Sequence, residues 1–435
     1  MCSPLLARVG SPHRASCKKL PEVTADASRL RRPSWMRIGF LFNHDQIHQV
    51  AHSLPIALAL AESGIDAEII VATTNARLAA EVRRMAGDAI GRGIEHLELR
   101  PGALTRRVDA LLGKVLPTAK LMIYRDNLAF FRSLDVLVVA EKTSLLLKDR
   151  YGLNDLAIVH TRHGAGDRAI GFDRASARFD HVLCSGPKIR TRLIEEAQVP
   201  AEKVSVVGYA KFDLVRDAPA HSFLPTSHKT VLYNPHVSPH LSSWYEHGHQ
   251  VFETFLDNPD FGLLFAPHVM LFERPFVVTI DKLSLDRAGQ IPLRFLRGDN
   301  IKIDLGSRAA TDMTYALSTD IYLGDASSQV YEFLLRPRPC IFLNTHRQAW
   351  QGNPNFTHWT LGEVIEHPDQ LPAALARADE LHEEIYLPVQ QRLFAESFDI
   401  TNTPSSIRAA EVIARIAEKR CTPKLGSARR LEPTA

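Results

Sequence analysis

The sequence lacks the cysteine spacing of a disulfide scaffold or a zinc site. Its five cysteines are spread over 435 residues, and no two of them form a CxxC pair. Scattered thiols of this kind are typical of reduced, mostly buried residues in a cytoplasmic protein. We therefore expect no disulfide framework and no zinc site, and we predict neither a metal nor a cofactor.

The sequence also lacks a strong charge excess and a long apolar run. The formal net charge of +3 is too small to indicate nucleic-acid binding. No apolar run reaches the roughly 18 residues that a membrane span requires. A hydrophobic content of 45% and a charged content of 23% are those of a soluble globular protein. We predict a cytoplasmic protein that binds no nucleic acid, and its 435 residues favour two domains.

The two ends of the chain show no periodic pattern. Residues 1–35 are basic, contain scattered prolines and lack the apolar core of a secretory signal. We expect them to be disordered, or to be an upstream extension of a chain that begins at Met36. The tail at 419–435 is also expected to be disordered.

Short apolar runs alternate with helical patterns between these ends. The first set comprises MRIGFLFN, DAEIIVATT, DVLVVA, LAIVHTRHG, FDHVLCSG and KVSVVGY. A linker rich in Pro, His and Ser at 216–229 precedes a second set, TVLYNP, FGLLFAPH, IKIDLG, DIYLGD and PCIFLN. Such alternation implies parallel sheets covered on both faces. We predict an α/β fold of two doubly wound, Rossmann-like domains facing a cleft, one at 36–215 and one at 225–395. The long helical stretch 371–418 ends in a helix, 396–418, that we expect to cross back to the first domain.

A polar turn follows the apolar run DIYLGD. Asp325, Ser327 and Ser328 lie between this strand and the helical pattern SQVYEFLL, which contains Glu332. Free backbone N–H groups at a helix start, with small residues around them, favour a bound phosphate. Glu332, one turn further along, is suited to accept hydrogen bonds from ribose hydroxyls. Ser327 is also a good N-cap residue, so capping alone is an alternative explanation of this serine.

Residues 312–344 resemble the C-terminal motif of the CDP-glycerol glycerophosphotransferases, which build or prime teichoic-acid-like polyol phosphate chains. The segment contains an acidic residue, an apolar run, the turn D-A-S-S, an E-F pair and an Arg-Pro dipeptide before the next strand. Three further segments resemble family segments in the same order: HTRHGAGDRAIGFD, FDHVLCSGPKIRTRLIEEAQVPAEKVSVVGYAKFD, and the pair TVLYNPHVS and LLFAPH. The resemblance covers roughly 130–345, about half of the chain.

The resemblance implies a GT-B fold and a transferase activity. The enzyme would move glycerol phosphate, or a related polyol phosphate, from a CDP-activated donor to a hydroxyl of a cell-surface polymer or lipid-linked acceptor. The C-terminal domain would hold the donor, and the N-terminal domain would supply the catalytic base. By position, His163 matches that base, and His268 matches the second catalytic histidine, which contacts phosphate. The matched donor-binding residues are Asp325, Ser327, Ser328 and Glu332.

The sequence departs from the family pattern around His268. Val269 follows this histidine where the family has proline, and neither Ala266 nor Pro267 supplies the usual basic residue. Ala326 also replaces a common tyrosine in the polar turn. These departures bear on the identity of the donor more than on the fold.

Two other functions stay open. A UDP-sugar-using GT-B enzyme, resembling the UDP-N-acetylglucosamine 2-epimerases or a capsule or lipopolysaccharide glycosyltransferase, also has a serine-rich turn before a C-terminal-domain helix. A preference for uridine over cytidine would distinguish such an enzyme. A catalytically silent GT-B-like module that binds a nucleotide is the second alternative, because the flanks of His268 are altered.

Several other residues are candidates by their place after predicted strands. His44, His48 and His52 recur every four residues, a spacing compatible with zinc on a helix. We favour a cleft-lining role in acceptor contacts, above all for His48. The remaining candidates are Arg162 and Gly164, placed beside His163 on the acceptor side, and His236, placed on the donor side.

Basic and apolar residues alternate at helical spacing in 102–131. A core-facing helix with a solvated basic side explains this pattern best. The alternative is contact with an anionic membrane surface, which would place the protein peripherally at the inner face of the plasma membrane.

Overall fold

The computed structural model describes residues 35–44, 46–103, 105–106, 118–162, 164–225, 229–273, 277–279 and 284–421. The predicted catalytic base, His163, lies outside these residues, as do residues 107–117. The extension expected at 1–35, except its last residue, and the tail beyond 421 lie outside them too.

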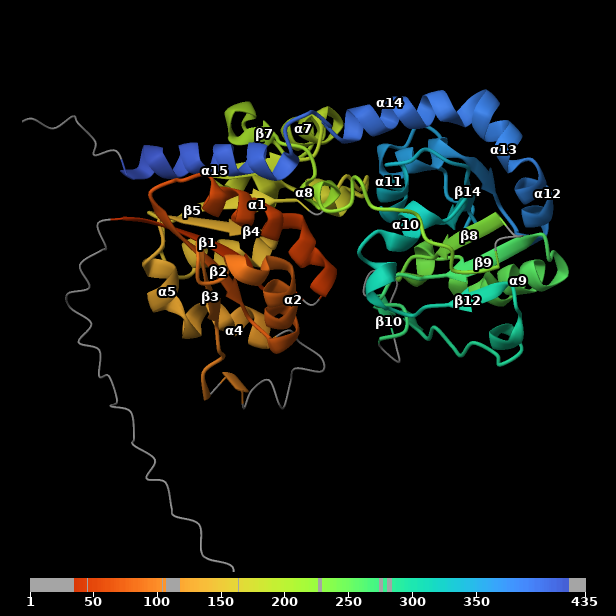
Figure 1. The fold of residues 1–435 in the computed structure, drawn as a ribbon, viewed down its shortest axis with the longest axis horizontal. Helices are drawn as coiled ribbons and strands as arrows, with labels where there is room; N and C mark the ends of the chain where they lie inside the picture. The colour runs from red at the N-terminus through yellow and green to blue at the C-terminus, as the bar shows by residue number, and fades with distance from the viewer. Residues whose placement is uncertain are drawn as a thin grey trace, which may run out of the picture. The chain divides into compact units, whose positions relative to one another are not determined.

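Seven parallel strands form the first sheet (Figure 1). Their order across the sheet is β3 (Ile94–Glu98), β2 (Ala67–Thr73), β1 (Met36–Phe42), β4 (Val136–Val139), β5 (Ala157–Thr161), β6 (His181–Cys184) and β7 (Val204–Val206). The central strands are wholly buried runs such as VLVV in β4, because helices cover both faces of a parallel sheet. The helices of this part are α1 (Val50–Glu62), α2 (Ala76–Ala86), α4 (Thr118–Asp126), α5 (Leu128–Arg132), α6 (Leu146–Asp149), α7 (Pro187–Glu195) and α8 (Ala210–Asp213).

Six parallel strands form the second sheet. Their order is β12 (Ile301–Ile303), β9 (Phe261–Phe265), β8 (Lys229–Asn234), β13 (Ile321–Gly324), β14 (Cys340–Leu343) and β15 (Glu363–Ile365). The helices that accompany it are α9 (Trp244–Asp257), α10 (Thr314–Ser318), α11 (Gln329–Phe333), α12 (Leu371–Ala376), α13 (Ala378–Leu381) and α14 (Leu387–Ser397). A separate antiparallel pair joins β10 (Val277–Thr279) to β11 (Ser284–Asp286).

Both sheets are doubly wound, which confirms the predicted α/β fold. The strand order reverses between β1 and β4 in the first sheet and between β8 and β13 in the second. Ligands of such sheets bind beyond the carboxyl ends of the strands, at the point where the order reverses. We therefore expect a ligand to bind near the loops after β1, β8 and β13.

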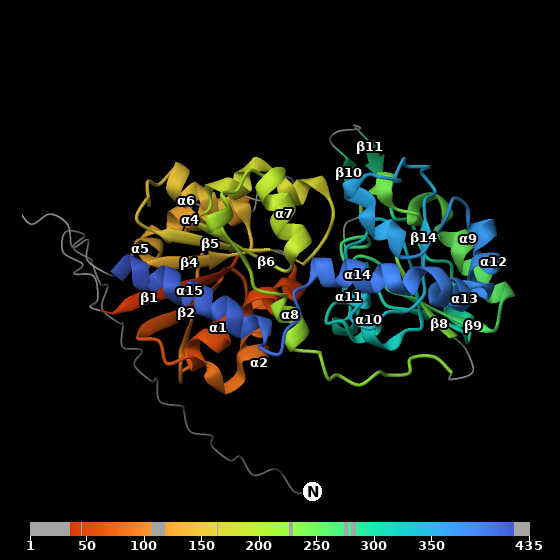
Figure 2. The ribbon, with the colours of Figure 1, turned by 90° about the horizontal axis from the view of Figure 1, so that it is seen from above.

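The expected helical stretch 371–418 is divided into several helices. The chain leaves helical conformation after α14 and resumes it at α15 (Ser405–Cys421), directly after Pro404. The carboxylate of Asp213 on α8 accepts hydrogen bonds from the backbone N–H groups of Ser405 and Ser406, at 3.1 and 2.7 Å, and so caps α15. The apolar face of α15 packs with α1 and β1 in one core cluster, and both views show α15 beside α1 (Figure 2).

The basic segment 102–131 is described only in part. In α4, Ile123 and Tyr124 are buried in the first core, whereas Leu121 is exposed. The described portion thus agrees with a core-facing helix, and membrane contact remains a prediction. Among the described residues, no helix is both long enough and apolar enough to cross a membrane.

Candidate functional site

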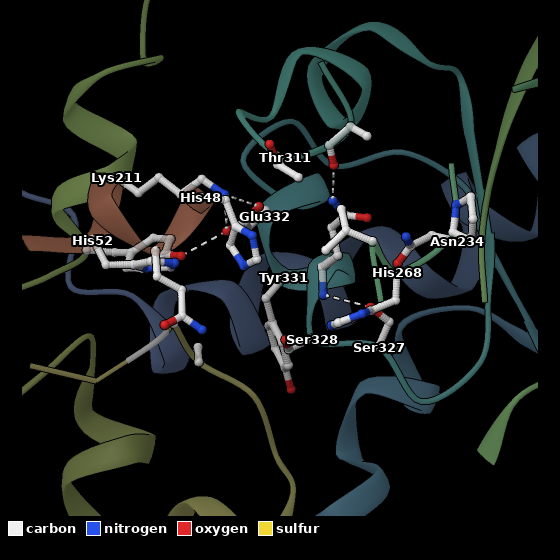
Figure 3. Close-up of a pocket in the computed structure, with 18 of the residues that line it drawn as sticks. His48, His52, Lys211, Asn234, His268, Thr311, Ser327, Ser328, Tyr331 and Glu332 are labelled. Carbon is white, nitrogen blue, oxygen red and sulfur yellow. Dashed lines mark hydrogen bonds and ion pairs between the residues drawn. The ribbon is translucent and has the colours of Figure 1, made fainter. Parts of the chain in front are cut away.

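A pocket in the described part of the chain is lined by loops that follow strands of both sheets (Figure 3). Its empty volume, with the open solvent at its mouth included, is about 750 Å³. Residues that line it after strands of the first sheet include His48, Gly164 and Lys211. Residues that line it after strands of the second sheet include His268, Ser327 and Glu332. We call this the main pocket.

The second sheet brings two polar turns together at the main pocket. Asn234 ends β8 and lies in register with Gly324, the last residue of the adjacent strand β13. The Asn234 amide donates to the carbonyl of Ala266, after β9, at 2.6 Å. Because parallel strands end at the same edge, the turn after Gly324 and the loop after β9 meet here.

Asp325 lies behind the main pocket and does not line it. Its side chain is fully buried, and its two oxygens accept from the backbone N–H groups of His236 and Ser243, both at 2.8 Å. The Ser243 hydroxyl adds a third bond at 3.1 Å. Burial raises the pKa of Asp325 to about 7, against the opposing effect of these donors. Asp325 therefore fixes the turns around the pocket.

We expect Asp325→Asn to lower the free energy of unfolding by about 2–3 kcal/mol. An amide has a single acceptor oxygen, so its NH₂ group would face one of the two backbone N–H donors. Urea unfolding of both proteins measures the difference. Ser243→Ala keeps both backbone donors to Asp325. It removes the Ser243 hydroxyl, which contacts Asp325 and also lies 2.8 Å from the Tyr233 hydroxyl, and should cost about 1–1.5 kcal/mol. Equal losses in the two variants would contradict this role for Asp325.

Ser327 and Ser328 both line the main pocket. The Ser327 hydroxyl accepts from the Gln329 backbone N–H at 3.3 Å, which supports a capping contribution, while Ser328 is exposed. The helix that follows, α11, has only five residues, so its dipole is weaker than the sequence pattern suggested. A bound anion would depend mainly on the hydroxyls. Gly166 lies so close to Ser328 that a Cβ there would stand 3.0 Å from the serine Cβ.

His268 lines the main pocket beside this turn. Its Nδ1 accepts from the Met270 backbone N–H at 3.3 Å, so the ring carries its proton on Nε2. Burial, helped by the charge of Arg168, lowers the pKa of His268 to about 4. At neutral pH the ring is a neutral hydrogen-bond donor, which suits contact with phosphate and does not suit proton abstraction.

His236 is buried and does not line the main pocket. Its ring nitrogen Nε2 lies 2.9 Å from Arg168 Nη1, and its Nδ1 accepts from the Ser238 N–H at 2.9 Å. Burial and the Arg168 charge hold the pKa of His236 well below its usual range. The His236 and His268 ring centroids are 6.1 Å apart, so His236 packs behind the residue that borders the pocket.

Glu332 lines the main pocket but is engaged by two residues from the first part of the chain. Lys211 Nζ lies 2.8 Å from each Glu332 carboxylate oxygen. The Tyr209 hydroxyl donates to one of these oxygens at 2.8 Å. The sequence analysis missed both partners, since neither belongs to a motif that suggested chemistry.

Of the three described residues predicted on the acceptor side, two line the main pocket and one does not. His48 and Gly164 line the main pocket, and Gly164 has a φ of +70°, a conformation that favours glycine. Arg162 does not line it: its guanidinium donates to the Gly171 carbonyl and lies 4.4 Å from the Phe172 ring centroid. Burial lowers the pKa of Arg162 to about 10.

A buried network stands beside the main pocket and centres on Asp167. Its carboxylate accepts from Lys188 Nζ at 2.8 Å, from the Tyr331 hydroxyl, and from the His358 backbone N–H at 3.0 Å. Lys188 Nζ also donates to the Tyr331 hydroxyl at 2.8 Å. Tyr331 lines the pocket, so this network holds one pocket wall against the loop after β5.

A second pocket adjoins the main one. His48, Lys211 and Thr311 line both. Its further polar lining includes Arg84 and Arg308, which both pair with Glu81, at 2.7 and 3.4 Å. We call it the side pocket.

The three early histidines do not form a metal site with one another. Within the described residues, no group of three or more His, Cys, Asp or Glu side chains is arranged to hold a metal ion. The His48 and His52 ring centroids are 6.4 Å apart, with His48 in a short 3-10 helix and His52 in α1.

Solved structures with a similar fold include several enzymes of nucleotide-activated substrates. The wall teichoic acid polymerase TagF, as its H444N variant, matches at a TM-score of 0.56 and 13% identity over 89% of each chain. UDP-GlcNAc 2-epimerase from Neisseria meningitidis, bound to UDP-GlcNAc, matches at 0.53 and 11% identity over 88% of this chain and 99% of that one. The chain has a GT-B-like fold.

Other comparisons bear on how far this likeness extends. The S. aureus MnaA–UDP structure also matches, at a TM-score of 0.53 and 15% identity, over 87% of this chain and 94% of that one. No protein-family model and no curated protein sequence matches the chain. The GT-B-like fold is thus shared with a polymerase and with epimerases.

Proposed function

We propose that this protein transfers glycerol phosphate, or a related polyol phosphate, from a CDP-activated donor to a hydroxyl of a surface-polymer or lipid-linked acceptor. One observation carries the proposal: Ser327, Ser328, His268 and Glu332 all line one pocket. Binding of a nucleoside diphosphate needs groups that donate hydrogen bonds to its phosphates, here two serine hydroxyls and a neutral histidine. It also needs a group that accepts hydrogen bonds from the ribose hydroxyls, here a carboxylate. The order of motifs that resembles the CDP-glycerol glycerophosphotransferases, and the fold shared with TagF, support the choice of donor.

The donor would lie on residues 225–395. Its diphosphate would contact the hydroxyls of Ser327 and Ser328 and the Nε2–H of His268. Its ribose would contact Glu332. Asp325 and His236 act behind these residues, since the first fixes the turn and the second packs against His268.

The acceptor would lie on residues 36–215 and enter through the side pocket. The three residues shared by both pockets, among them His48, mark where acceptor and donor would meet. The acceptor oxygen attacks the phosphorus that bears the polyol, its proton passes to His163, and the bond from that phosphorus to the bridging oxygen breaks. CMP leaves with that oxygen, and the polyol phosphate stays on the acceptor. Hydrogen bonds from His268 and the serines would stabilise the charge on the leaving phosphate. We place the reaction in the cytoplasm, at the inner face of the plasma membrane if 102–131 contacts it.

Binding measurements test the donor. The full chain is titrated calorimetrically with CDP-glycerol, CDP-ribitol, CMP, UDP-GlcNAc and UMP. We expect selective binding of the cytidine diphosphates, weakened about 10- to 100-fold by Ser327→Ala/Ser328→Ala because two phosphate hydrogen bonds are lost. The control is Ser222→Ala, because Ser222 is exposed and lines neither the main pocket nor the side pocket. Unchanged binding by the double variant would contradict the assignment.

A UDP-sugar enzyme is the second candidate, because the epimerase structures match nearly as well as TagF. Preferential binding of UDP-GlcNAc and UMP would favour it. Nucleotide binding with no turnover on any acceptor would instead favour a silent nucleotide-binding module.

A further inference from the structure

The main pocket contains little fixed positive charge for a ligand as anionic as a diphosphate. Among the described residues that line it, Lys211 is the one Lys or Arg side chain. The residues before His268, Ala266 and Pro267, carry no charge, and α11 is too short to supply a strong helix dipole. Transfer of a phosphoryl group depends on cationic groups that offset the charge of the phosphates. Lys211 is therefore the main fixed positive charge in the described lining of the main pocket.

Lys211 is held in place before any ligand arrives. It lies in α8, and its side chain is only 4% exposed. Its ammonium contacts both oxygens of Glu332, whose side chain is 12% exposed. The pair is nearly withdrawn from water, so each charge depends on the other for stabilisation.

The position of Glu332 places Lys211 within reach of a phosphate. Ser328 and Glu332 are four residues apart, at the start and in the body of α11, and residues at this spacing share one face of a helix. A phosphate bound by the exposed Ser328 hydroxyl would thus lie beside the Lys211 ammonium. A lysine ammonium on a flexible stem can rotate from one anion to another, which a bidentate arginine does less readily.

We propose that Lys211 is the cation that binds the donor diphosphate, and that its ion pair with Glu332 opens as the donor enters. The exchange moves the ammonium from the carboxylate to the phosphate and frees Glu332 for the ribose hydroxyls. The proposal rests on the proposed function, since it specifies how the same pocket receives its donor. The direct ion pair between α8, which follows the first sheet, and α11 of the second would then be replaced by a contact through the bound phosphate.

The test separates phosphate binding from nucleoside binding. Wild-type full chain, Lys211→Met and Lys211→Arg are titrated calorimetrically with cytidine, CMP, CDP and inorganic pyrophosphate. We expect Lys211→Met to reduce the ratio of CDP to cytidine affinity about 10- to 100-fold and to bind cytidine at least as well as wild type. Lys211→Arg should keep only part of that ratio, because its guanidinium retains the positive charge but leaves Glu332 less readily. Lys148→Met, which breaks the ion pair with Asp180 away from both pockets, is the matched control and should leave the ratio unchanged.

Glu332→Gln should change phosphate affinity in the direction opposite to Lys211→Met. Without the competing carboxylate, Lys211 should bind pyrophosphate more tightly than in wild type, by about 10-fold, while cytidine binds more weakly. A purely structural ion pair predicts neither change. The proposal is overturned if Lys211→Met keeps the wild-type CDP-to-cytidine ratio, or if it loses cytidine and CDP in equal proportion.

The outcomes also separate this proposal from the proposed function. If wild type prefers UDP to CDP, the cytidine donor is wrong, and the same ratio measured with uridine and UDP decides the role of Lys211. If wild type binds CDP but Lys211→Met keeps the wild-type ratio of CDP to cytidine affinity, the cytidine donor is supported and the proposed role of Lys211 is wrong. If wild type binds neither nucleotides nor pyrophosphate, both are wrong.

Discussion

Asp167→Asn should lower the free energy of unfolding by about 3–5 kcal/mol near neutral pH. The wild-type carboxylate is fully buried and receives Lys188, Tyr331 and the His358 backbone. The variant leaves the Lys188 ammonium, 13% exposed, without its counter-charge. Urea unfolding at pH 7 measures the loss. Glu98→Gln, which removes one partner of the exposed Arg83–Glu98 pair, should change stability by less than about 1 kcal/mol.

The loss at Asp167 should depend on pH in a defined direction. Burial alone would raise the pKa of Asp167, but the hydrogen bond from His358 and the Lys188 charge outweigh it and lower the pKa to about 2. The folded state therefore binds fewer protons than the unfolded state between that value and the usual pKa near 4. The contribution of the Asp167 carboxylate to the free energy of unfolding is therefore fully present above pH 4 and is lost as the pH falls toward 2. The difference between wild type and Asp167→Asn should shrink over that interval. A difference that is constant from pH 7 to pH 2 would contradict the ion-pair account.

His268→Ala should reduce the turnover of CDP-glycerol about 10²- to 10³-fold, the effect of removing one donor that stabilises transition-state charge. The measurement is CMP release at saturating donor, with the donor Kd measured separately. His268→Gln should recover part of the rate, because the glutamine amide nitrogen can replace Nε2–H. His247→Gln, in α9 and away from both pockets, is the control and should keep wild-type turnover.

The pH profile distinguishes a donor from a base at His268. With its pKa near 4, the ring is neutral from pH 6 to pH 8, so the ratio of wild-type to variant turnover should stay constant over that range. A general base would lose its activity on protonation. A ratio of wild-type to variant turnover that falls tenfold for each pH unit below 6.5 would therefore indicate that His268 acts as a base instead.

The sequence was sufficient to predict where most of the main strands lie along the chain, and the polar turn after β13. Runs such as TVLYNP and PCIFLN form largely buried strands that are followed by polar turns. Such short apolar runs can therefore be recognised as strands from the sequence alone. β3 and β15 were missed because their residues are partly exposed and polar, as in IEHLE and EVI. Within 371–418, α14 ends at Ser397 and α15 begins at Ser405, where Asp213, nearly two hundred residues away, accepts from the first backbone N–H groups.

The candidate site was harder to predict, because burial decides the roles of its acidic residues. Asp325 and Glu332 look alike as acids near a strand end, yet the first is enclosed by backbone N–H groups and the second faces the pocket. Lys211 pairs with Glu332, 121 residues away, and Asp167 joins the nearby Lys188 to Tyr331 and His358, which are 164 and 191 residues away. No local pattern encodes such pairings, so the structure was needed to find them.

A crystal structure of the full chain soaked with CDP-glycerol tests the central claim most directly. The account predicts that the diphosphate lies against Ser327, Ser328 and the Nε2 of His268, with the ribose at Glu332. A nucleotide bound outside the main pocket, or one whose phosphates point away from the two serines, would contradict it.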